Sequence, residues 1–249
     1  MKKEGKYLYC IIGGNDGRNF GPIGIGGRGD IVSTLGHDDI SAALSSSPME
    51  RYVINRDNLT AHENVIEEVM KDYTVLPVRF CTIAATAEDV RTLLRRRYRE
   101  FKGLLRDMDN KVEMGLKAVW KEMSQIYSQI EQTPDVRSLK KRISASKGTE
   151  NQGLKIALGK AVKTSLDARK EKETRRILQA FRRLAIDMRA NEGYGDRMFL
   201  NAAFLIDRTR EKQFDFMVED LVKQYGDTAD FKYVGPAPPF NFINIEVKW

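Results

Sequence analysis

The chain has very little cysteine and histidine for its 249 residues, with two of each. Cys10 and Cys81 both lie in apolar, strand-like surroundings, so we expect small buried side chains and no disulfide, which a reducing compartment would not maintain. Neither His37 nor His62 has a cysteine, histidine or carboxylate partner at the spacing that binds zinc. His62 falls in the first turn of an expected helix, where packing is its simplest role. The sequence therefore predicts no metal site.

Long apolar runs are also missing. No stretch approaches the roughly 18 apolar residues of a membrane-spanning helix. Residues 7–14 follow a basic start but are too short for the apolar region of a signal peptide and lack a cleavage site. Hydrophobic residues make up 41% of the chain and charged residues 31%, enough for a core and a well-hydrated surface. We expect a cytoplasmic protein with no membrane partner and room for two domains.

Motifs for catalysis and cofactor binding are scarce. Residues 24–29 (GIGGRG) formally match the G-x-G-x-x-G dinucleotide fingerprint. That fingerprint works only directly between a strand and a helix, where backbone N–H groups meet the pyrophosphate. Here the first expected strand ends about twelve residues earlier, and the β-branched residues 31–34 follow. There is no phosphate-binding Gly-Lys-Ser/Thr and no nucleophile elbow. We expect no catalytic residue, no cofactor and no enzyme.

Positive charge is concentrated in one part of the chain. The formal net charge is +7, but residues 137–189 hold 16 lysines and arginines against 5 acidic residues, an excess of +11. The rest of the chain therefore sums to about −4. This block also has the apolar periodicity of helices, so the charge belongs to one helical face or arm. Such a face is available to an acidic partner.

Nucleic-acid binding is the alternative function that this basic block raises. Basic helices neutralise phosphates, and residues 91–99 add a second arginine cluster. Glutamates lie among the bases of the longer block, which is typical of a solvated helix with ion pairs. The sequence has no zinc-finger spacing and no aromatic-basic RNA-binding motif. We interpret the charges as a solvated face, whose candidate contacts with an acidic protein are Arg175, Arg176, Arg182 and Arg183.

The first part of the chain predicts a domain over residues 1–103 that mixes strands with helices. Residues 13–29 read as a glycine-rich loop, and Pro77 inside an expected strand indicates a sheet edge or a bulge. Thr60 and Glu63 have the spacing of a capping box at the start of a helix. The expected strands are residues 6–12, 31–34, 51–54 and 74–80, and the expected helices are residues 38–44, 60–72 and 88–101.

The second part, residues 104–249, predicts a ferredoxin-like domain with long basic helices. Residues 111–120 alternate apolar and polar side chains, which is typical of a strand. Helices are expected over residues 121–130, in pieces over 134–189, and over 214–226, and further strands over residues 197–206, 231–234 and 240–247. This β-α-β-β-α-β order has an enlarged first helical crossover. The fold class is therefore α+β in two domains: a mixed α/β N-terminal domain and a ferredoxin-like C-terminal domain with a helical insertion.

Five short segments of the chain are distinctive as sequence motifs. Residues 202–206 form an apolar run that suits a strand buried on both faces. Residues 235–239 are too rich in proline for a helix or a central strand. The segments, in chain order, are YLYCII at 7–12, the helix start at 61–62, LPVRF at 76–80, NAAFLIDR at 201–208 and GPAPPFNF at 235–242.

Together these segments resemble the gas vesicle protein F/L family, over almost the whole chain from about Lys6. Two positions depart from the family pattern. Cys81 stands where a glycine is expected, and Ala237 stands where a bulkier apolar residue is common. The resemblance implies a minor accessory protein of gas vesicles, which are gas-filled, lipid-free protein shells that give cells buoyancy. No enzymatic role is implied.

The resemblance implies partners and a location as well. The expected partners are the main shell protein, which is small and very apolar, and other gas vesicle accessory proteins. The expected location is the gas vesicle within the cytoplasm. The chain would keep the shell protein soluble or help to nucleate and assemble the shell. We hypothesise that an exposed sheet edge of this chain is the contact, because such an edge can cover the exposed strand surface of the unassembled shell protein. The candidate contacts there are Arg79, Phe80 and Phe240.

Overall fold

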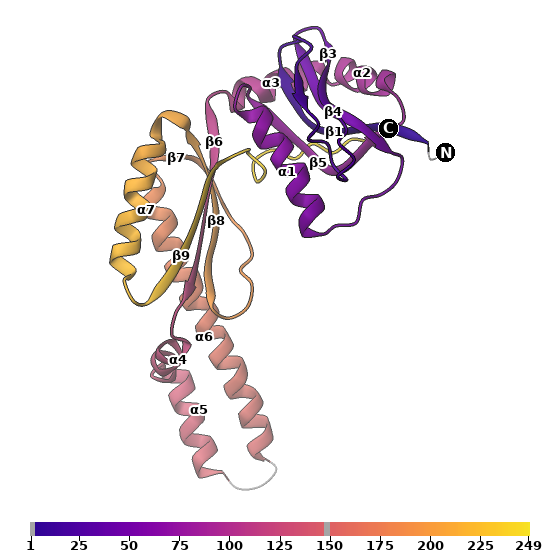
Figure 1. Cartoon of the computed structure of the whole chain (residues 1–249). Coiled ribbons are helices and arrows are strands. Elements are labelled where there is room, and N and C mark those ends of the chain that lie inside the picture. Colours follow the sequence, from indigo (N-terminus) through magenta and orange to yellow (C-terminus); the bar gives the residue numbers. More distant parts are fainter. Residues whose placement is uncertain (1–2, 147–149) are drawn as a thin grey trace. The chain divides into compact units, whose positions relative to one another are not determined.

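The chain forms two compact units in a computed structural model that describes residues 3–146 and 150–249 (Figure 1). Unit 1 contains Met1–Glu113, Leu205–Thr209 and Gly235–Trp249. Unit 2 contains Met114–Phe204 and Arg210–Val234. Each unit holds one antiparallel sheet, so the fold is mixed α/β. The sequence placed the domain boundary at residue 103, whereas the compact units divide at 113 and two later segments rejoin the first unit.

Unit 1 is built on a five-stranded sheet in which β1 is an inner strand. The order is β2-β3-β4-β1-β5, and β1 pairs antiparallel with both β4 and β5. Strand β1 is buried along most of its length, which agrees with its apolar sequence and with its place between two neighbouring strands. The strands are β1 Glu4–Gly13, β2 Asn19–Gly21, β3 Val32–His37, β4 Ile40–Pro48 and β5 Val75–Ala84.

Helices cover both faces of this sheet. Helix α1, Arg56–Met70, packs Val65 and Ile66 against the face that carries Tyr7. Helices α2, Ala87–Arg96, and α3, Tyr98–Met108, cover the other face, which carries Leu8 and Ile11. A bulge between Leu8 and Cys10 inserts Tyr9 as an extra residue, so that Tyr7, Tyr9 and Cys10 all join the α1 side.

Local signals explain where the helices of unit 1 begin. The side chain of Asn55 accepts the N–H of Asn58 at 2.9 Å and caps α1. The capping box predicted at Thr60 and Glu63 is therefore wrong, because α1 has already begun at Arg56. Helix α2 has a complete capping box between Thr86 and Asp89, which also places acidic side chains at its positive end.

Two predicted elements of unit 1 are wrong. Residues 38–44 do not form a helix but turn into β4 after Asp38, whose φ of 51° fits a tight hairpin between β3 and β4. The small serine and alanine side chains of β4 fit between two neighbouring strands, yet they show no strand periodicity in the sequence. Residues 51–54 form no strand, and Val53 and Ile54 are exposed.

Unit 2 contains a four-stranded sheet in the order β7-β8-β6-β9. Helices α6 and α7 meet on the sheet: the Phe181 ring lies 4.8 Å from Phe214 and 5.1 Å from Phe204 between ring centroids. The elements in chain order are β6 Lys111–Trp120, α4 Met123–Glu131, α5 Pro134–Ala145, α6 Glu150–Phe181, β7 Ala185–Ala190, β8 Met198–Asp207, a 3-10 turn Arg208–Arg210, α7 Glu211–Tyr225 and β9 Ala229–Ala237.

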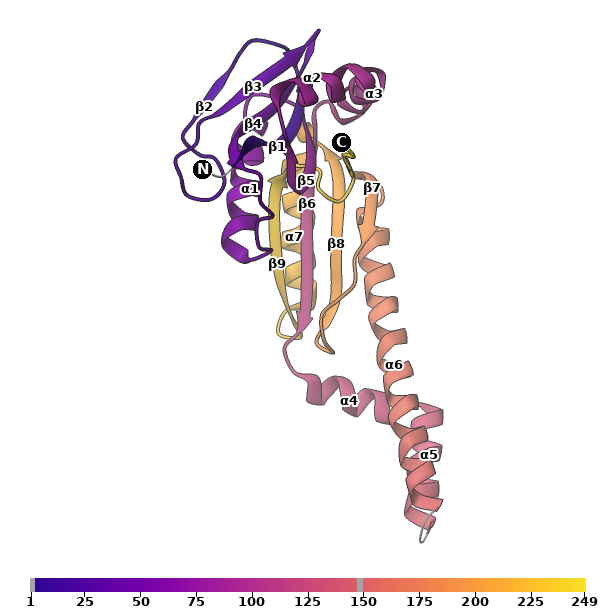
Figure 2. The ribbon, with the colours of Figure 1, turned by 90° about the vertical axis from the view of Figure 1, so that its right-hand side faces the viewer.

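A helical hairpin extends from this sheet. Helices α5 and α6 run side by side beyond the end of the strands (Figure 2). The predicted strand over residues 111–120 and the predicted helix over residues 121–130 are confirmed as β6 and α4. The helix predicted up to residue 189 is wrong at its end, because Ala185–Ala190 is the edge strand β7.

The strand predicted over residues 240–247 does not complete the second sheet. Pro238 and Pro239 are followed by a turn, in which Phe242 and Ile243 donate their N–H groups to the carbonyl of Pro239. Beyond that turn the chain makes one isolated parallel bridge, between Ile245 and Val78 of β5. The apolar alternation of Ile243 and Ile245 therefore serves the core of unit 1.

Candidate interaction surfaces

The edge strand β5 is interrupted by a wide bulge. Leu8 of β1 lies opposite Thr82, but Cys10 lies opposite Pro77, so residues 78–81 leave the regular ladder. The Thr82 hydroxyl donates to the carbonyl of Arg79 at 2.6 Å and closes the bulge. The edge or bulge predicted from Pro77 is confirmed. Cys81 has a φ of 65°, a left-handed conformation that glycine adopts most easily, which explains the glycine expected there.

The C-terminal segment contacts this bulge. The N–H of Arg79 donates to the carbonyl of Ile245 at 3.3 Å. The Arg79 guanidinium lies 2.9 Å from the Glu246 carboxylate, and both side chains are about half exposed or more. Arg97 of the α2–α3 junction donates to the carbonyl of Glu246 at 2.9 Å. Arg79, the first of the predicted contact residues, is therefore exposed on the surface of unit 1, in an ion pair of low strength.

Phe80 and Phe240 are packing residues. Both are half-buried and contact the same core cluster beneath α1. The Phe80 ring lies 5.7 Å from the His62 ring and 6.5 Å from the Tyr7 ring. Their remaining exposure leaves only a partial surface for a partner, and replacing either by a charged residue would disturb the core.

A buried polar network lies under the bulge. His62 is only 4% exposed, and its Nε2 lies 3.2 Å from the carbonyl of Val78. A carbonyl only accepts, so Nε2 carries the hydrogen and Nδ1 accepts from the Tyr7 hydroxyl at 3.1 Å. The Tyr7 hydroxyl in turn accepts the N–H of Cys81 at 2.8 Å. Burial lowers the pKa of His62 to about 4 and raises the pKa of Tyr7, so both are neutral near pH 7.

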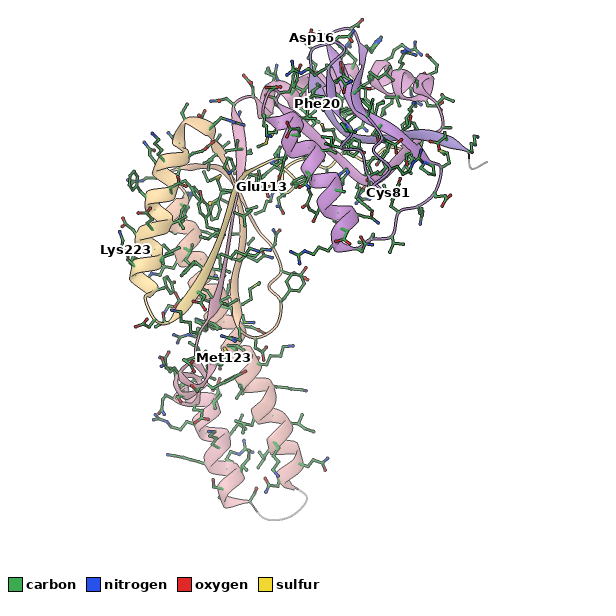
Figure 3. The ribbon with its side chains drawn as sticks, in the orientation of Figure 1. Asp16, Phe20, Cys81, Glu113, Met123 and Lys223 are labelled. Atoms are coloured by element: carbon green, nitrogen blue, oxygen red, sulfur yellow. The ribbon has the colours of Figure 1, made fainter. Side chains whose placement is uncertain are left out.

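A second buried group holds the C-terminal segment. Glu113, labelled with Cys81 in Figure 3, is 6% exposed. Its carboxylate accepts the backbone N–H of Asn241 at 2.7 Å and the side-chain amide of Asn241 at 2.5 Å. Burial raises the pKa of the Glu113 carboxyl, and the two hydrogen bonds oppose that rise. Sequence analysis missed this contact, because alternation along residues 111–120 places Glu113 on the polar face of a strand.

The four predicted arginine contacts lie in unit 2, near the C-terminal end of α6. Arg175 forms an ion pair with Glu171 one turn earlier. The guanidinium of Arg176 lies 5.9 Å above the ring of Tyr225 in α7. Arg182 and Arg183 are exposed in the turn that follows the helix. The structure therefore gathers these four bases at one end of α6 and places Arg79, Phe80 and Phe240 in unit 1.

Chemical sites are scarce in the parts of the chain that the structure describes. Over residues 3–146 and 150–249, no three His, Cys, Asp or Glu side chains are placed to hold a metal ion. None of the helices in these ranges is both long and apolar enough to cross a membrane. The glycine-rich residues 24–29 connect β2 and β3 and do not precede a helix, so the geometry of the dinucleotide fingerprint is missing there.

Comparison with known proteins identifies the family. The sequence profile described as "Gas vesicle synthesis protein GvpL/GvpF" matches residues 5–244. The chain belongs to the GvpL/GvpF family. Gas vesicle protein F of Streptomyces sp. (strain CB03234) is 30% identical over 226 residues, covering 89% of this chain and 93% of its own. Gas vesicle protein L of the same organism is 28% identical over 260 residues, covering 96% and 93%.

Solved structures of gas vesicle F proteins share the fold. The crystal structure of GvpF from Anabaena sp. PCC7120 matches with a TM-score of 0.83 at 23% identity, over 98% of this chain and 100% of its own. GvpF from Microcystis aeruginosa matches with a TM-score of 0.76 at 26% identity, over 96% and 98%. The mixed α/β architecture with two antiparallel sheets is therefore shared with GvpF structures. Membership of the GvpL/GvpF family supports an accessory role in gas vesicles.

Proposed function

We propose that this chain is an accessory protein that binds the main gas vesicle shell protein and assists its solubility, nucleation or assembly. The observation that carries the proposal is the GvpL/GvpF match over residues 5–244. The proposed site of action is the gas vesicle within the cytoplasm. Other gas vesicle accessory proteins are proposed as further partners, and no catalytic step is involved.

The first proposed contact is a sheet edge. Extended partner segments add to exposed edges through backbone hydrogen bonds, and an apolar shell protein before assembly presents such segments. The β5 edge carries exposed Arg79 but is occupied at Val78 by Ile245. Strand β9 is an edge strand of the second sheet, and its Val234 is 49% exposed. We therefore favour the β9 edge over the β5 bulge with Phe80, and Phe240 in unit 1 is a separate candidate contact.

The second proposed contact is the arginine group at the end of α6. Exposed guanidinium groups give salt-dependent attraction to acidic surface. Arg182 and Arg183 project from a turn, so they are better placed for a partner than Arg176, which lies over Tyr225. The two contacts make different predictions for salt dependence, since only the arginine contact weakens when salt screens charge.

Coexpression with the main shell protein tests the proposal. The full chain should raise the soluble fraction of the shell protein, measured by quantitative immunoblot after centrifugation. Val234→Asp should reduce that fraction if β9 is the contact. The four changes Arg175→Glu, Arg176→Glu, Arg182→Glu and Arg183→Glu should reduce it if the arginines are the contact. A shell protein that stays insoluble beside the well-folded wild-type chain would refute direct binding.

Matched controls separate surface effects from unfolding. Lys117, Lys163, Lys212 and Lys223 are exposed lysines of unit 2 that lie outside β9, so their joint change to Glu reverses as much charge on other surface. This control should leave the soluble fraction unchanged. Phe240→Asp tests Phe240 as a contact and should reduce the soluble fraction of the shell protein if Phe240 binds it. Phe240 also packs against a core cluster, so circular dichroism must show that the variant is folded before a reduced fraction is assigned to a lost contact.

The same protein preparations test nucleic-acid binding. Under the proposed function, the chain should bind duplex and single-stranded oligonucleotides only weakly at physiological salt, without sequence preference. A sequence-selective complex of submicromolar affinity under those conditions would instead support the basic helices as a nucleic-acid interface.

We also infer that unit 2 is a ferredoxin-like domain with an enlarged first crossover. The support is the chain order β6, α4–α6, β7, β8, α7, β9 together with the sheet order β7-β8-β6-β9. The enlargement consists of α4, α5 and the first part of α6. An experimental structure in which β6 and β7 were neighbours would contradict this inference.

A further inference from the structure

The helical hairpin of unit 2 has an incomplete core. We use the term arm for two segments of this hairpin: residues 137–146, which are the end of α5 with its C-cap, and residues 151–165 of α6. Val136 and Leu166 at its base are buried, but no side chain of the arm itself is. The arm nevertheless carries six large apolar side chains, which are half-buried or exposed: Leu139, Ile143, Leu154, Ile156, Leu158 and Val162.

The arm also carries the excess charge of the whole chain. Residues 136–166 contain eight lysines and arginines against one acidic residue, which equals the net +7 of the entire sequence. Lys140 forms an ion pair with Glu131 at 2.6 Å. Among the described residues, no carboxylate forms an ion pair with the other exposed bases of the arm. Arg137 donates to the side-chain oxygen of Gln132, and the remaining bases are Lys141, Arg142, Lys155, Lys160 and Lys163.

Ile156 and two lysines of α6 share one outward face. Leu154, Leu158 and Ala161 recur at helical spacing and are half-buried, which places them toward α5. Ile156 lies on the opposite side of the helix and is 57% exposed. Lys160 and Lys163 follow it by four and seven residues, on the same side. An exposed apolar side chain is thus lined by bases along one helical face.

The chemistry of this face favours a protein partner. Residues 134–180 contain no Phe, Tyr or Trp, so the arm offers no ring on which the bases of single-stranded nucleic acid stack. A phosphate backbone would engage the lysines and leave the exposed side chain of Ile156 without a contact. A helix with a narrow apolar stripe and acidic flanks would cover Ile156 and pair with Lys160 and Lys163 beside it.

We propose that the arm is a docking surface for an acidic amphipathic helix of a partner protein. Charge complementarity selects the acidic flanks, and the exposed side chain of Ile156 selects the apolar stripe. The α6 part of the arm, residues 151–165, is about 22 Å long at roughly 1.5 Å per residue, so it fits a partner helix of roughly four turns. This proposal does not depend on the shell protein and uses other residues than the contacts of the proposed function.

Binding of a synthetic helix to the full chain tests the proposal. The probe is a fluorescein-labelled 21-residue peptide of three heptads, with Leu at positions a and d and mainly Glu elsewhere. Fluorescence anisotropy at 0.15 M salt should show binding that weakens as salt rises. A peptide of the same composition in scrambled order has the charge without the stripe. It should bind at least about tenfold more weakly, and equal binding would overturn the proposal.

Matched variants locate the contact. Joint change of Lys155, Lys160 and Lys163 to Glu should weaken binding by at least about tenfold. The same change at Lys117, Lys212 and Lys232, exposed lysines elsewhere in unit 2, should alter it by less than about twofold. Ile156→Ser should weaken binding several-fold, whereas Ile186→Ser on β7, where Ile186 is 54% exposed, should not.

Competing ligands and a folding check complete the test. The arm variant must keep the helix content and melting temperature of the wild type, because its three lysines are exposed and pair with no carboxylate of the described residues. Unchanged peptide binding in that folded variant would overturn the proposal. Tighter binding of a 20-base-pair duplex or of phosphatidylserine vesicles than of the peptide would do the same. Solubility of the shell protein should be unaffected by the arm variant, which separates this test from the proposed function.

Discussion

At the residue scale, buried polar side chains in unit 1 are held by partners that lie far away in the sequence. His62 of α1 contacts Tyr7 of β1 and the carbonyl of Val78 in β5, so three elements meet at one ring. Each hydrogen-bonding group of that ring has a partner, which offsets the cost of removing it from water. The arrangement keeps His62 neutral and gives this residue a structural role.

Stability should therefore depend on His62 below neutral pH. The pKa of this side chain is lowered from 6.5 to about 4 on folding, so the unfolded chain takes up a proton first as pH falls. The stabilisation is present above the unfolded pKa and is lost progressively toward the folded one. We expect the free energy of unfolding to drop by about 2 kcal/mol between pH 7 and pH 5 from this group. Urea denaturation at both pH values measures it.

Two variants isolate this effect. His62→Gln should be less stable at pH 7 but should lose most of the slope between pH 7 and pH 5. His37→Gln changes the only other histidine, which is half-buried beside Asp38, and should retain the slope. Equal slopes in the wild type and His62→Gln would show that another group governs the acid sensitivity.

At the element scale, the wide bulge of β5 limits how much of that sheet edge is free to pair with another strand. Residues 78–81 leave the ladder with β1, and Val78 pairs instead with Ile245. A flat edge strand would offer continuous donors and acceptors to other chains, and bulges limit such pairing. The left-handed backbone at Cys81 is part of this bulge, and a non-glycine residue there is strained.

Substitution at Cys81 should reveal that strain. Gly and Ala both remove the contact between the Tyr52 N–H and the Cys81 sulfur, which is 3.3 Å long. Glycine alone tolerates a φ of 65° without cost. Cys81→Gly should therefore be more stable than Cys81→Ala by about 1 kcal/mol in chemical denaturation. An alanine variant as stable as the glycine variant would mean that the backbone relaxes at this position.

At the scale of the whole molecule, the chain leaves unit 1 and later returns to it. Gly235–Trp249 belongs to unit 1, where Ile243 and Ile245 are buried in the core beneath α2 and α3. Glu113 and Arg97 bind the same segment through its backbone. Unit 1 is therefore completed only by the end of the sequence, so a fragment ending near residue 113 would lack core side chains.

Joint change of Ile243 and Ile245 to Ala should destabilise unit 1 strongly. Each truncation of a buried isoleucine costs about 2–5 kcal/mol, because the removed contacts leave a cavity. Hydrogen exchange should then show lost protection in β1 and β5, with β6 and β9 retained. Trp249→Ala is the control, since Trp249 is 54% exposed and its loss should cost about 0.5 kcal/mol or less. Lost protection confined to β9 would support the strand predicted from the sequence.

The periodicity of the sequence correctly predicted the strands whose apolar pattern is clear without reference to the neighbouring strands. Residues 111–120 carry apolar side chains at every second position and form β6, and the apolar run at 202–206 lies within β8. Residues 38–44 failed because serine and alanine carry no clear period, and their strand depends on two neighbours. Among the candidate contacts, the exposure of Arg79 and the core packing of Phe80 and Phe240 were not readable from the sequence, because burial depends on segments far along the chain.

The sequence by itself determined the mixed α/β class, the basic helices and the family resemblance, because composition, local periodicity and short motifs carry these properties. Only the tertiary structure decided where the C-terminal segment packs. Ile243 and Ile245 have the same alternation in either sheet, and the turn after Pro239 directs them to unit 1. The exposure of the arm is likewise tertiary, because an apolar stripe on a helix does not say whether another element covers it.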